Sequence, residues 1–135
     1  MVTTNGSFDI LHTGHVSNLI FAKKQGDVLI VGVNSDSSVR RNKGVGRPFT
    51  PARERAEIIA SLKPVDAVFI YEELTPVKWI KILKPHVHVK GADRTMAEIV
   101  EKEAVESVGG KVVRAPYLKN KSTTGIIAKI RLGRR

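Results

Sequence analysis

The chain has 135 residues, 41% of them hydrophobic, which suits one domain with its own core, and no shift in composition marks a second domain. It contains no cysteine, which excludes a disulfide scaffold and thiol chemistry. No apolar run approaches the roughly 18 residues that cross a membrane, and the first residues lack the basic and apolar parts of an export signal, so we expect a cytoplasmic location.

The net charge of +10, from 23 basic and 13 acidic residues, attracts anions. Phosphorylated small molecules are natural partners of such a surface. Nucleic acid is the competing interpretation, because a basic domain also binds a phosphate backbone. The basic residues are spread along the chain, however, and only 5% of residues are aromatic, without the basic and aromatic interleaving used for base stacking. The composition therefore favours small anions.

Apolar runs alternate with helical patterns along the chain, which predicts parallel strands joined by crossover helices. In order, we expect a strand at 2–5, a helix at 14–24, a strand at 27–33, a helix at 51–62, a strand at 65–71, a helix at 75–83, a strand at 87–89, a helix at 95–108, a strand at 111–114 and a helix after Ser122. Thr50 and Thr75 are candidate N-caps ahead of prolines, and Ile126, Ile127 and Ile130 are the expected buried face of the last helix.

Residues 36–48 have no sustained periodicity and hold four basic side chains, those of Arg40, Arg41, Lys43 and Arg47, against the single acid Asp36. We predict a mobile loop here, suited to close over a triphosphate.

These elements predict an α/β fold: a single doubly wound, Rossmann-like domain over residues 1–135, with a five-stranded parallel sheet and helices on both faces. Ligands of such sheets bind outside the carboxyl ends of the strands. The segments 5–15, 34–48, 90–94 and 115–124 each follow a strand, so we expect them to meet at one edge.

The first of these segments carries two imidazoles, His12 and His15, at the expected start of a helix. Unpaired N–H groups and the helix dipole make a helix start an anion site. Gly6 is expected to take the angles of a tight turn, and Gly14 to allow close approach to a phosphate. Spacing alone would also fit ordinary satisfied histidines or a fragment of a metal site.

The run Gly6-x-Phe8-Asp9-x-x-His12-x-Gly14-His15 resembles the signature of the HxGH nucleotidyltransferase superfamily, also called cytidylyltransferase-like. Within it, the chain is most similar to the adenylyltransferase domain of the bifunctional ADP-heptose synthase of lipopolysaccharide core biosynthesis. Landmarks of that domain follow in order: Asn34-Ser35-Asp36, the segment 43–48, Arg55, Val65-Asp66, Lys90-Gly91-Ala92-Asp93 and Ser122-Thr123-Thr124.

The resemblance implies an enzyme that moves a nucleoside monophosphate from a nucleoside triphosphate, expected to be ATP, to a phosphorylated acceptor such as a heptose 1-phosphate, releasing pyrophosphate. Glycerol-3-phosphate cytidylyltransferases and FAD synthetases share the signature and stay open as alternatives. A noncatalytic nucleotide- or RNA-binding module is the alternative from another class. Residues 118–121 are basic and Ala92 stands where glycine is common, so base and acceptor are left undecided.

The resemblance also implies roles for individual residues. The catalytic residues would be His12, His15 and Lys43, and the substrate-binding residues Lys90, Arg47 and Arg55. The nucleotide-binding residues would be Gly6, Ser7, Phe8, Asp9, Thr13, Gly14, Asp93, Ser122, Thr123 and Thr124.

Mg²⁺ is the expected metal, because it prefers oxygen ligands and is often held mainly by substrate phosphates. No protein ligand for it is assigned. Zinc bound by His12, His15, His86 and His88 is disfavoured, because His86 and His88 would face opposite sides of a strand and cysteine is absent. Relatives are commonly dimers, so a homodimer is expected.

Overall fold

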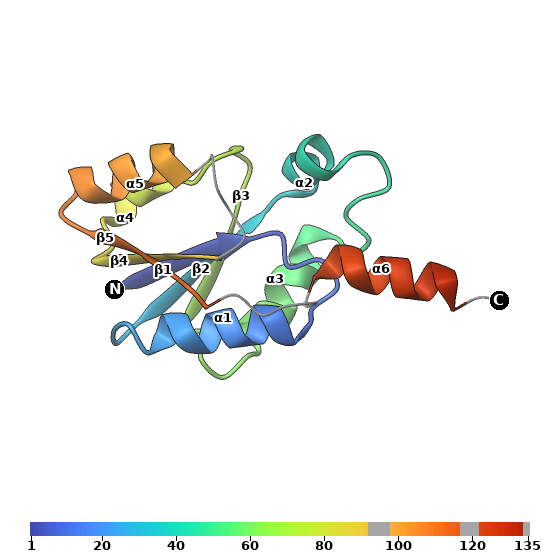
Figure 1. Cartoon of the computed structure of the whole chain (residues 1–135). Helices are drawn as coiled ribbons and strands as arrows, with labels where there is room; N and C mark the ends of the chain where they lie inside the picture. Colours follow the sequence, from blue (N-terminus) through green and yellow to red (C-terminus); the bar gives the residue numbers. More distant parts are fainter. Residues whose placement is uncertain (92–97, 117–121, 134–135) are drawn as a thin grey trace.

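The structure is a computed structural model that describes residues 1–91, 98–116 and 122–133 (Figure 1). Its strands are β1 (Val2–Gly6), β2 (Leu29–Asn34), β3 (Ala67–Tyr71), β4 (Val87–Lys90) and β5 (Lys111–Arg114). Its helices are α1 (Thr13–Lys23), α2 (Asp36–Lys43), α3 (Ala52–Ala60), α4 (Val77–Leu83), α5 (Glu98–Ser107) and α6 (Thr123–Leu132).

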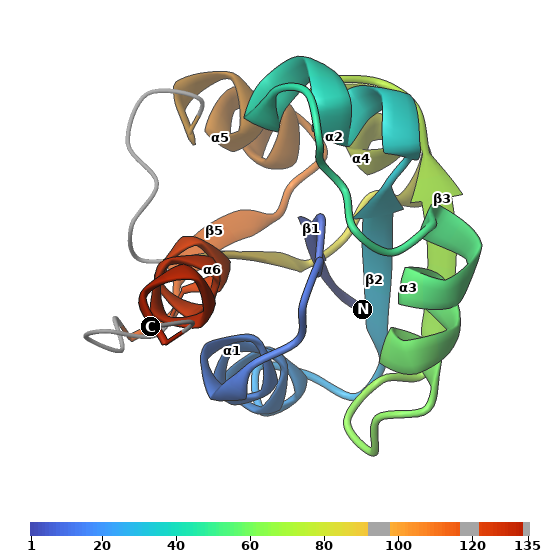
Figure 2. The ribbon, with the colours of Figure 1, turned by 90° about the vertical axis from the view of Figure 1, so that its right-hand side faces the viewer.

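The five strands form one parallel sheet in the order β3-β2-β1-β4-β5, which confirms the predicted fold class. Helices α1 and α3 lie on one face of this sheet, and α4 and α5 lie on the other (Figures 1 and 2). Among the described residues, no helix is long and apolar enough to cross a membrane.

Each face of the sheet has its own hydrophobic core, because successive side chains of a strand point to opposite faces. Leu29, Val31 and Val33 of β2 pack toward α1 and α3. On the other face, Trp79 packs with Tyr71 near Gly32, where an added Cβ would come within 3.1–3.2 Å of the aromatic rings. Gly32 therefore makes room for the aromatic cluster.

The strand order changes direction between β1 and β4. The chain runs outward from β1 through β2 to β3, and then returns to β4 on the other side of β1. In doubly wound sheets this switch point leaves a crevice at the carboxyl ends of the two strands. The end of β1 leads directly into the segment that carries His12 and His15.

The prediction of a loop over residues 36–48 was wrong for its first half, since residues 36–43 form helix α2. Ser35 caps this helix by accepting a hydrogen bond from the N–H of Ser38, and Asp36 adds a negative charge to the first turn. Ser38 and Val39 are buried. With Val39 its one apolar residue, the helix has no apolar stripe from which periodicity could reveal it.

The expected N-caps Thr50 and Thr75 were also wrong. The cap positions of α3 and α4 are Pro51 and Pro76, which make no capping hydrogen bond. At α3 the Asp36 carboxylate accepts from the N–H of Ala52 at 2.9 Å, so a side chain from α2 does the capping.

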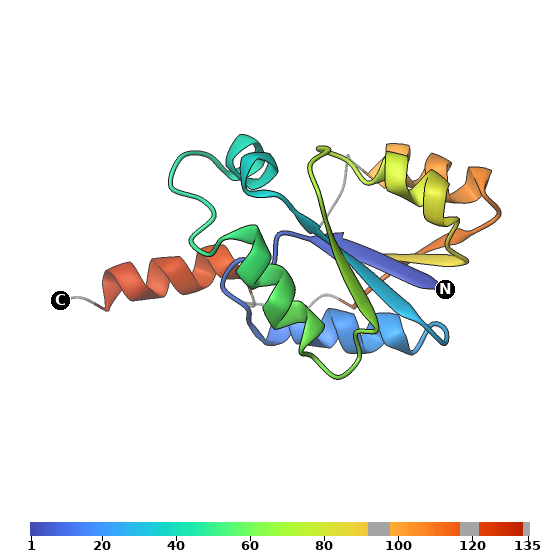
Figure 3. The same ribbon diagram turned by 180° about the vertical axis from the view of Figure 1, so that it is seen from behind.

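Helix α6 does not bury the face predicted for it. It extends away from the sheet (Figure 3) and has no buried residue. Ile126 and Ile127 are half-buried, whereas Ile130 is 59% exposed. Its N-terminus is as predicted, because Ser122 accepts a hydrogen bond from the N–H of Gly125.

Candidate active site

A hollow with a volume of about 240 Å³, named the first hollow, lies at the switch point. Its walls come from the ends of β1 and β4, the starts of α1 and α6, and the end of α2. The segments expected to meet at this edge do so. Twelve of the predicted site residues line it: Gly6, Ser7, Phe8, His12, Gly14, His15, Lys43, Arg47, Lys90, Ser122, Thr123 and Thr124.

The two histidine rings stack at the start of α1, with centroids 3.8 Å apart. Nδ1 of His12 accepts a hydrogen bond from the N–H of Gly14 at 3.0 Å. Nδ1 of His15 accepts one from the N–H of His12 at 3.2 Å. The pair forms a capping box built from imidazoles, which satisfies two N–H groups of the helix start.

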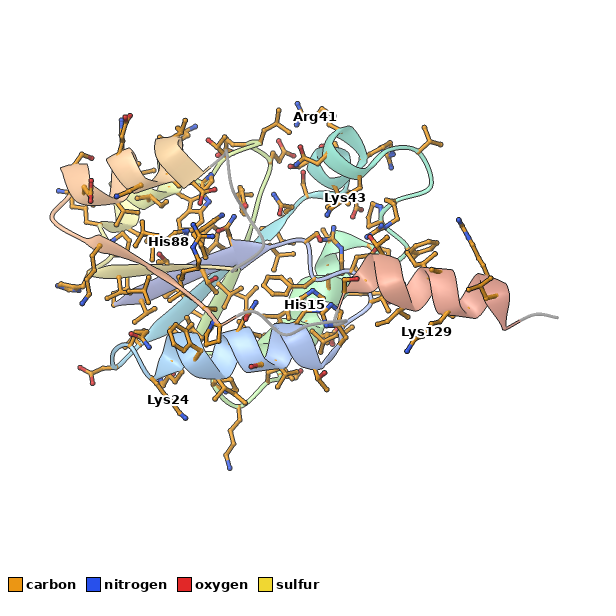
Figure 4. All side chains as sticks on the ribbon, viewed as in Figure 1. His15, Lys24, Arg41, Lys43, His88 and Lys129 are labelled. Carbon is orange, nitrogen blue, oxygen red and sulfur yellow. The ribbon has the colours of Figure 1, made fainter. Side chains whose placement is uncertain are left out.

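These hydrogen bonds fix the tautomer of each neutral ring. A neutral imidazole accepts through one nitrogen and carries its proton on the other, so the proton of each ring lies on Nε2. Burial, together with the neighbouring His12 ring and the Lys43 ammonium, lowers the pKa of His15 to about 4. His15 is therefore a neutral Nε2–H donor at pH 7, and it lines the hollow (Figure 4).

The turn between β1 and α1 is strained at residues other than the predicted glycine. Phe8 and Ile10 have positive φ angles of 53° and 56°, whereas Gly6 does not. Gly6 instead provides space, because a Cβ there would lie 3.2 Å from the ring of Phe8. The prediction that Gly6 supplies turn angles was thus wrong.

Three cationic side chains line the first hollow from three directions. Lys43 is the last residue of α2 and not part of a loop (Figure 4). Arg47 comes from the segment after it, and Lys90 from the end of β4. Together with the Nε2–H donors, they form a lining suited to a polyanion.

Asp9 holds the segment after α2 in place. Its fully buried carboxylate accepts hydrogen bonds from Nε of Arg47 at 3.1 Å and from the N–H groups of Phe49 at 2.9 Å and Thr50 at 3.1 Å. Its main-chain oxygen accepts from the hydroxyl of Thr123 at 2.7 Å. Asp9, predicted to be a nucleotide-binding residue, does not line the hollow, and its contacts are those of a residue that organises the turn.

The start of α6 supplies the opposite wall of the hollow. The Thr123 hydroxyl donates to the main-chain oxygen of Asp9. A ligand at this wall would therefore meet main-chain N–H groups and the hydroxyls of Ser122 and Thr124. Ser122 accepts from Gly125 through its oxygen and keeps its own proton for donation.

Three predicted site residues are not in the first hollow, and one is outside the described residues. Thr13 is exposed at the first turn of α1. Arg55 is 1% exposed and donates to the main-chain oxygens of Ser7 at 2.6 Å and Thr50 at 2.7 Å, and to the Asp36 carboxylate at 2.7 Å. Its place is structural, and not that of a substrate ligand. Asp93 lies outside the described residues.

A second hollow, of about 270 Å³, adjoins the first and shares Asn5, Ser7 and Lys43 with it. It lies over the ends of β2 and β3, and its remaining lining is Asn34, Val39, Asn42, Tyr71, Leu74, Thr75 and Glu101. Nδ2 of Asn5 donates to the Tyr71 hydroxyl at 2.8 Å, which holds the amide between the two hollows.

A buried charged cluster lies beneath these hollows. Nζ of Lys90 is 2.5 Å from Oε2 of Glu101, and both side chains are about 95% buried. Nε2 of His88 is 3.8 Å from the same oxygen, and its Nδ1 pairs with the Thr3 hydroxyl at 2.8 Å. His86 contacts the N-terminal amine. The described residues contain no group of three side chains able to hold a metal ion.

The cytidylyltransferase-like family model matches residues 3–129. The chain belongs to this family. The match begins within β1 and ends within α6, so it includes all the walls of both hollows. The family membership predicted from the signature is confirmed, and with it the class of nucleotidyltransferases.

Proteins with similar sequences include the bifunctional protein HldE of Geotalea uraniireducens, 53% identical over 133 residues, which are 98% of this chain and 27% of that protein. HldE of Mesorhizobium japonicum is 51% identical over 130 residues, 96% of this chain and 26% of that protein. The chain thus spans about a quarter of the length of these relatives. A lipopolysaccharide core biosynthesis protein from Thermoplasma volcanium matches at a TM-score of 0.77 and 32% identity, over 87% of this chain and 97% of that one.

Several lining residues were missed by sequence reasoning. Asn18, which lines the first hollow, lies one helical turn after His15, and this spacing could have revealed it. Asn5 and Tyr71 gave no motif signal, and neither did Glu101, because α5 is not one of the segments that follow a strand end.

Proposed function

We propose that this cytidylyltransferase-like chain transfers a nucleoside monophosphate from ATP to a phosphate oxygen of a sugar phosphate and releases pyrophosphate. The observation that carries the proposal is the pair of stacked histidines, whose Nε2–H donors line the same hollow as Lys43, Arg47, Lys90 and Ser122. Such a ring of donors suits a triphosphate. The relatives named HldE and the lipopolysaccharide core protein support a sugar phosphate as acceptor.

In this reaction, an oxygen of the acceptor phosphate attacks the α-phosphorus, and the bond from that phosphorus to the oxygen bridging to the β-phosphorus breaks. The electron pair leaves with pyrophosphate, so no protein nucleophile and no net proton transfer are needed. His12 and His15 would donate from Nε2 to the phosphate oxygens on which charge develops, as donors of an oxyanion hole do. Lys43 would compensate the charge of the leaving pyrophosphate.

The second hollow is the proposed acceptor site. It shares Lys43 with the first hollow, so an acceptor phosphate bound at that junction would lie beside the triphosphate. Holding the two reactants side by side supplies much of the catalysis in phosphoryl transfer.

Mg²⁺ is proposed to enter with the nucleotide. Among the described residues, the lining of the first hollow contains no carboxylate, and the nearby Asp9 carboxylate is occupied by Arg47, Phe49 and Thr50. A hard cation in this lining would be held by phosphate oxygens, water and hydroxyls such as that of Ser122. Bound there, it would neutralise phosphate charge. Titration calorimetry should show no binding of MgCl₂ alone and binding of the Mg²⁺–ATP complex.

The decisive experiment is a pyrophosphate-release screen that crosses ATP and CTP with heptose 1-phosphate, glycerol 3-phosphate and FMN. We expect turnover with ATP and the heptose phosphate. Turnover only with CTP, or only with another acceptor, would correct the substrate assignment, and silence across the grid would refute the enzymatic proposal.

A homodimer in the cytoplasm is proposed as the working form. The dimer is supported by α6, which exposes Ile130 and Leu132 by 59% and 63%. The location is supported by the proposed need for a nucleoside triphosphate. Light scattering on the purified chain tests the dimer, and a monomer at micromolar concentration would refute it.

A further inference from the structure

Glu101 is an acidic side chain in a site otherwise suited to anions. It lies on α5, is 4% exposed and lines the second hollow. Among the described residues it is the sole carboxylate of that lining, and Lys43 is the sole cation. A carboxylate in a phosphate-binding region repels the phosphate, so its presence calls for a separate reason.

Glu101 is held in its charged form and in one orientation. Burial by itself would raise its pKa, but the neighbouring His88 and Lys90 outweigh burial and hold the pKa of Glu101 below its usual range. Both neighbours approach the same oxygen, Oε2, with Lys90 at 2.5 Å and His88 at 3.8 Å. A carboxylate offers about four lone pairs on two oxygens, so Oε1 keeps acceptor capacity for a ligand.

The other polar groups of the second hollow are uncharged. They are the amides of Asn5, Asn34 and Asn42 and the hydroxyls of Ser7, Tyr71 and Thr75. Oδ1 of Asn5 is buried and has no hydrogen-bond partner among the described residues. The hollow thus offers a cation where it meets the first hollow, and hydrogen-bonding groups with a carboxylate elsewhere. This arrangement fits a molecule with a phosphate at one end and hydroxyl groups over the rest.

We propose that Glu101 is a specificity-determining residue, whose carboxylate accepts hydrogen bonds from the hydroxyl groups of a sugar phosphate or polyol phosphate acceptor in the second hollow. The proposal rests on the proposed function. The Glu101 carboxylate can only accept hydrogen bonds, and neither an ionised second phosphate nor a ring carbonyl can donate one. Glu101 therefore discriminates against acceptor substrates that lack hydroxyl groups. Lys90 then acts as a positioning residue through Glu101.

The test substitutes Glu101→Gln in the whole chain and measures steady-state kinetics with ATP and a sugar 1-phosphate. The matched control is Glu103→Gln, which neutralises an exposed carboxylate on the same helix. We expect the KM for the acceptor to rise roughly ten- to hundred-fold in Glu101→Gln, because hydrogen bonds to charged groups are the strong ones. The KM for ATP should stay within about twofold, and Glu103→Gln should change neither.

A deoxy acceptor separates recognition from structure. Removing the hydroxyl that contacts Glu101 should weaken the wild-type enzyme by the same factor as the substitution, and should weaken Glu101→Gln little further. If Glu101 were purely structural, the loss of affinity from the substitution and that from the missing hydroxyl would add independently, or the KM values for ATP and for the acceptor would rise equally. Either result would overturn the proposal.

Calorimetry keeps the proposal testable without turnover and without the glutamine variant. Wild-type protein should bind a sugar 1-phosphate at least about tenfold more tightly than inorganic phosphate. Equal affinities would overturn the role of Glu101. Tight binding without any pyrophosphate release would refute the proposed function and leave this inference standing.

A second variant serves if Glu101→Gln does not fold. Glu101→Asp keeps the charge on a shorter side chain and should lower the preference for the sugar phosphate over inorganic phosphate. An unchanged preference would overturn the proposal.

Discussion

His15 has two hydrogen-bonding functions on one ring, and substitutions can separate them. Its Nδ1 caps α1 by accepting from the N–H of His12, and its Nε2–H is the proposed donor to phosphate. Asn places an acceptor near Nδ1, and Gln places a donor near Nε2. The two variants therefore remove different functions.

We expect His15→Asn to lower kcat about 10²- to 10³-fold with little change in melting temperature, because the oxyanion donor is lost and the cap is kept. His15→Gln should retain more activity but lose about 1 kcal/mol of stability with the cap. Kinetics with thermal denaturation of the two variants check this. The reverse pattern, with Asn active and Gln dead, would show that the cap and not the donor is essential.

The low pKa of His15 is a second residue-scale prediction. Its pKa is about 4 in the folded protein against 6.5 in the unfolded chain, so the unfolded state binds the extra proton first as the pH falls. Stability from this group is fully present above pH 6.5 and is lost between pH 6.5 and 4, by up to about 1.4 kcal/mol per pH unit.

NMR titration of the imidazole signals, with denaturant unfolding at each pH, measures both quantities. His15→Asn should flatten the stability profile between pH 6.5 and 4. A His15 midpoint near 6.5 would contradict the buried, neutral donor described here.

At the scale of elements, Arg55 shows how a charge in a motif becomes part of the framework. On α3 it holds the main-chain oxygens of Ser7 and Thr50, and so connects the segment after β1 to the start of its own helix. Arg53, on the same helix, is exposed. These two arginines form a matched pair for substitution by methionine.

Arg55→Met should reduce the free energy of unfolding by about 2–4 kcal/mol, because the part-buried main-chain oxygens of Ser7 and Thr50 and the Asp36 carboxylate lose their donor. Arg53→Met should change it by less than about 0.5 kcal/mol. Urea denaturation gives both values. If Arg55→Met is as stable as the wild type and differs from it only by a raised KM for ATP, Arg55 binds substrate and is not structural.

The elements that the sequence revealed are those with strong apolar patterns. All five strands were predicted, the buried strand β2 most directly, because a strand buried on both faces reads as a continuous apolar run. Four of the segments that follow strands were also predicted to meet at the site, but the segment after β3, which lines the second hollow, was not. Helix α2 was missed, since its buried face consists of Ser38 and Val39. The sequence also could not reveal the roles of Arg55 and Glu101, because a residue type shows a charge but not the burial and the partners that the fold gives it.

The whole molecule carries a net charge of +10, which acts at distances longer than any contact in the site. Such a field raises the local concentration of an anionic substrate, and salt screens it. It acts on nucleotide and RNA alike, so charge by itself does not separate an enzyme from an RNA-binding module. The hollows do separate them, because they enclose small volumes of about 240 and 270 Å³.

We therefore expect kcat/KM for ATP to fall roughly three- to tenfold between about 0.05 and 0.5 M salt, while kcat changes little, because steering affects encounter more than chemistry. RNA should compete only weakly, and its inhibition should vanish over the same range of salt. Initial-rate kinetics with and without a single-stranded RNA measure both effects. Binding of RNA that persists at high salt and excludes ATP would mean that the surface, and not the paired hollows, is the working part of the molecule.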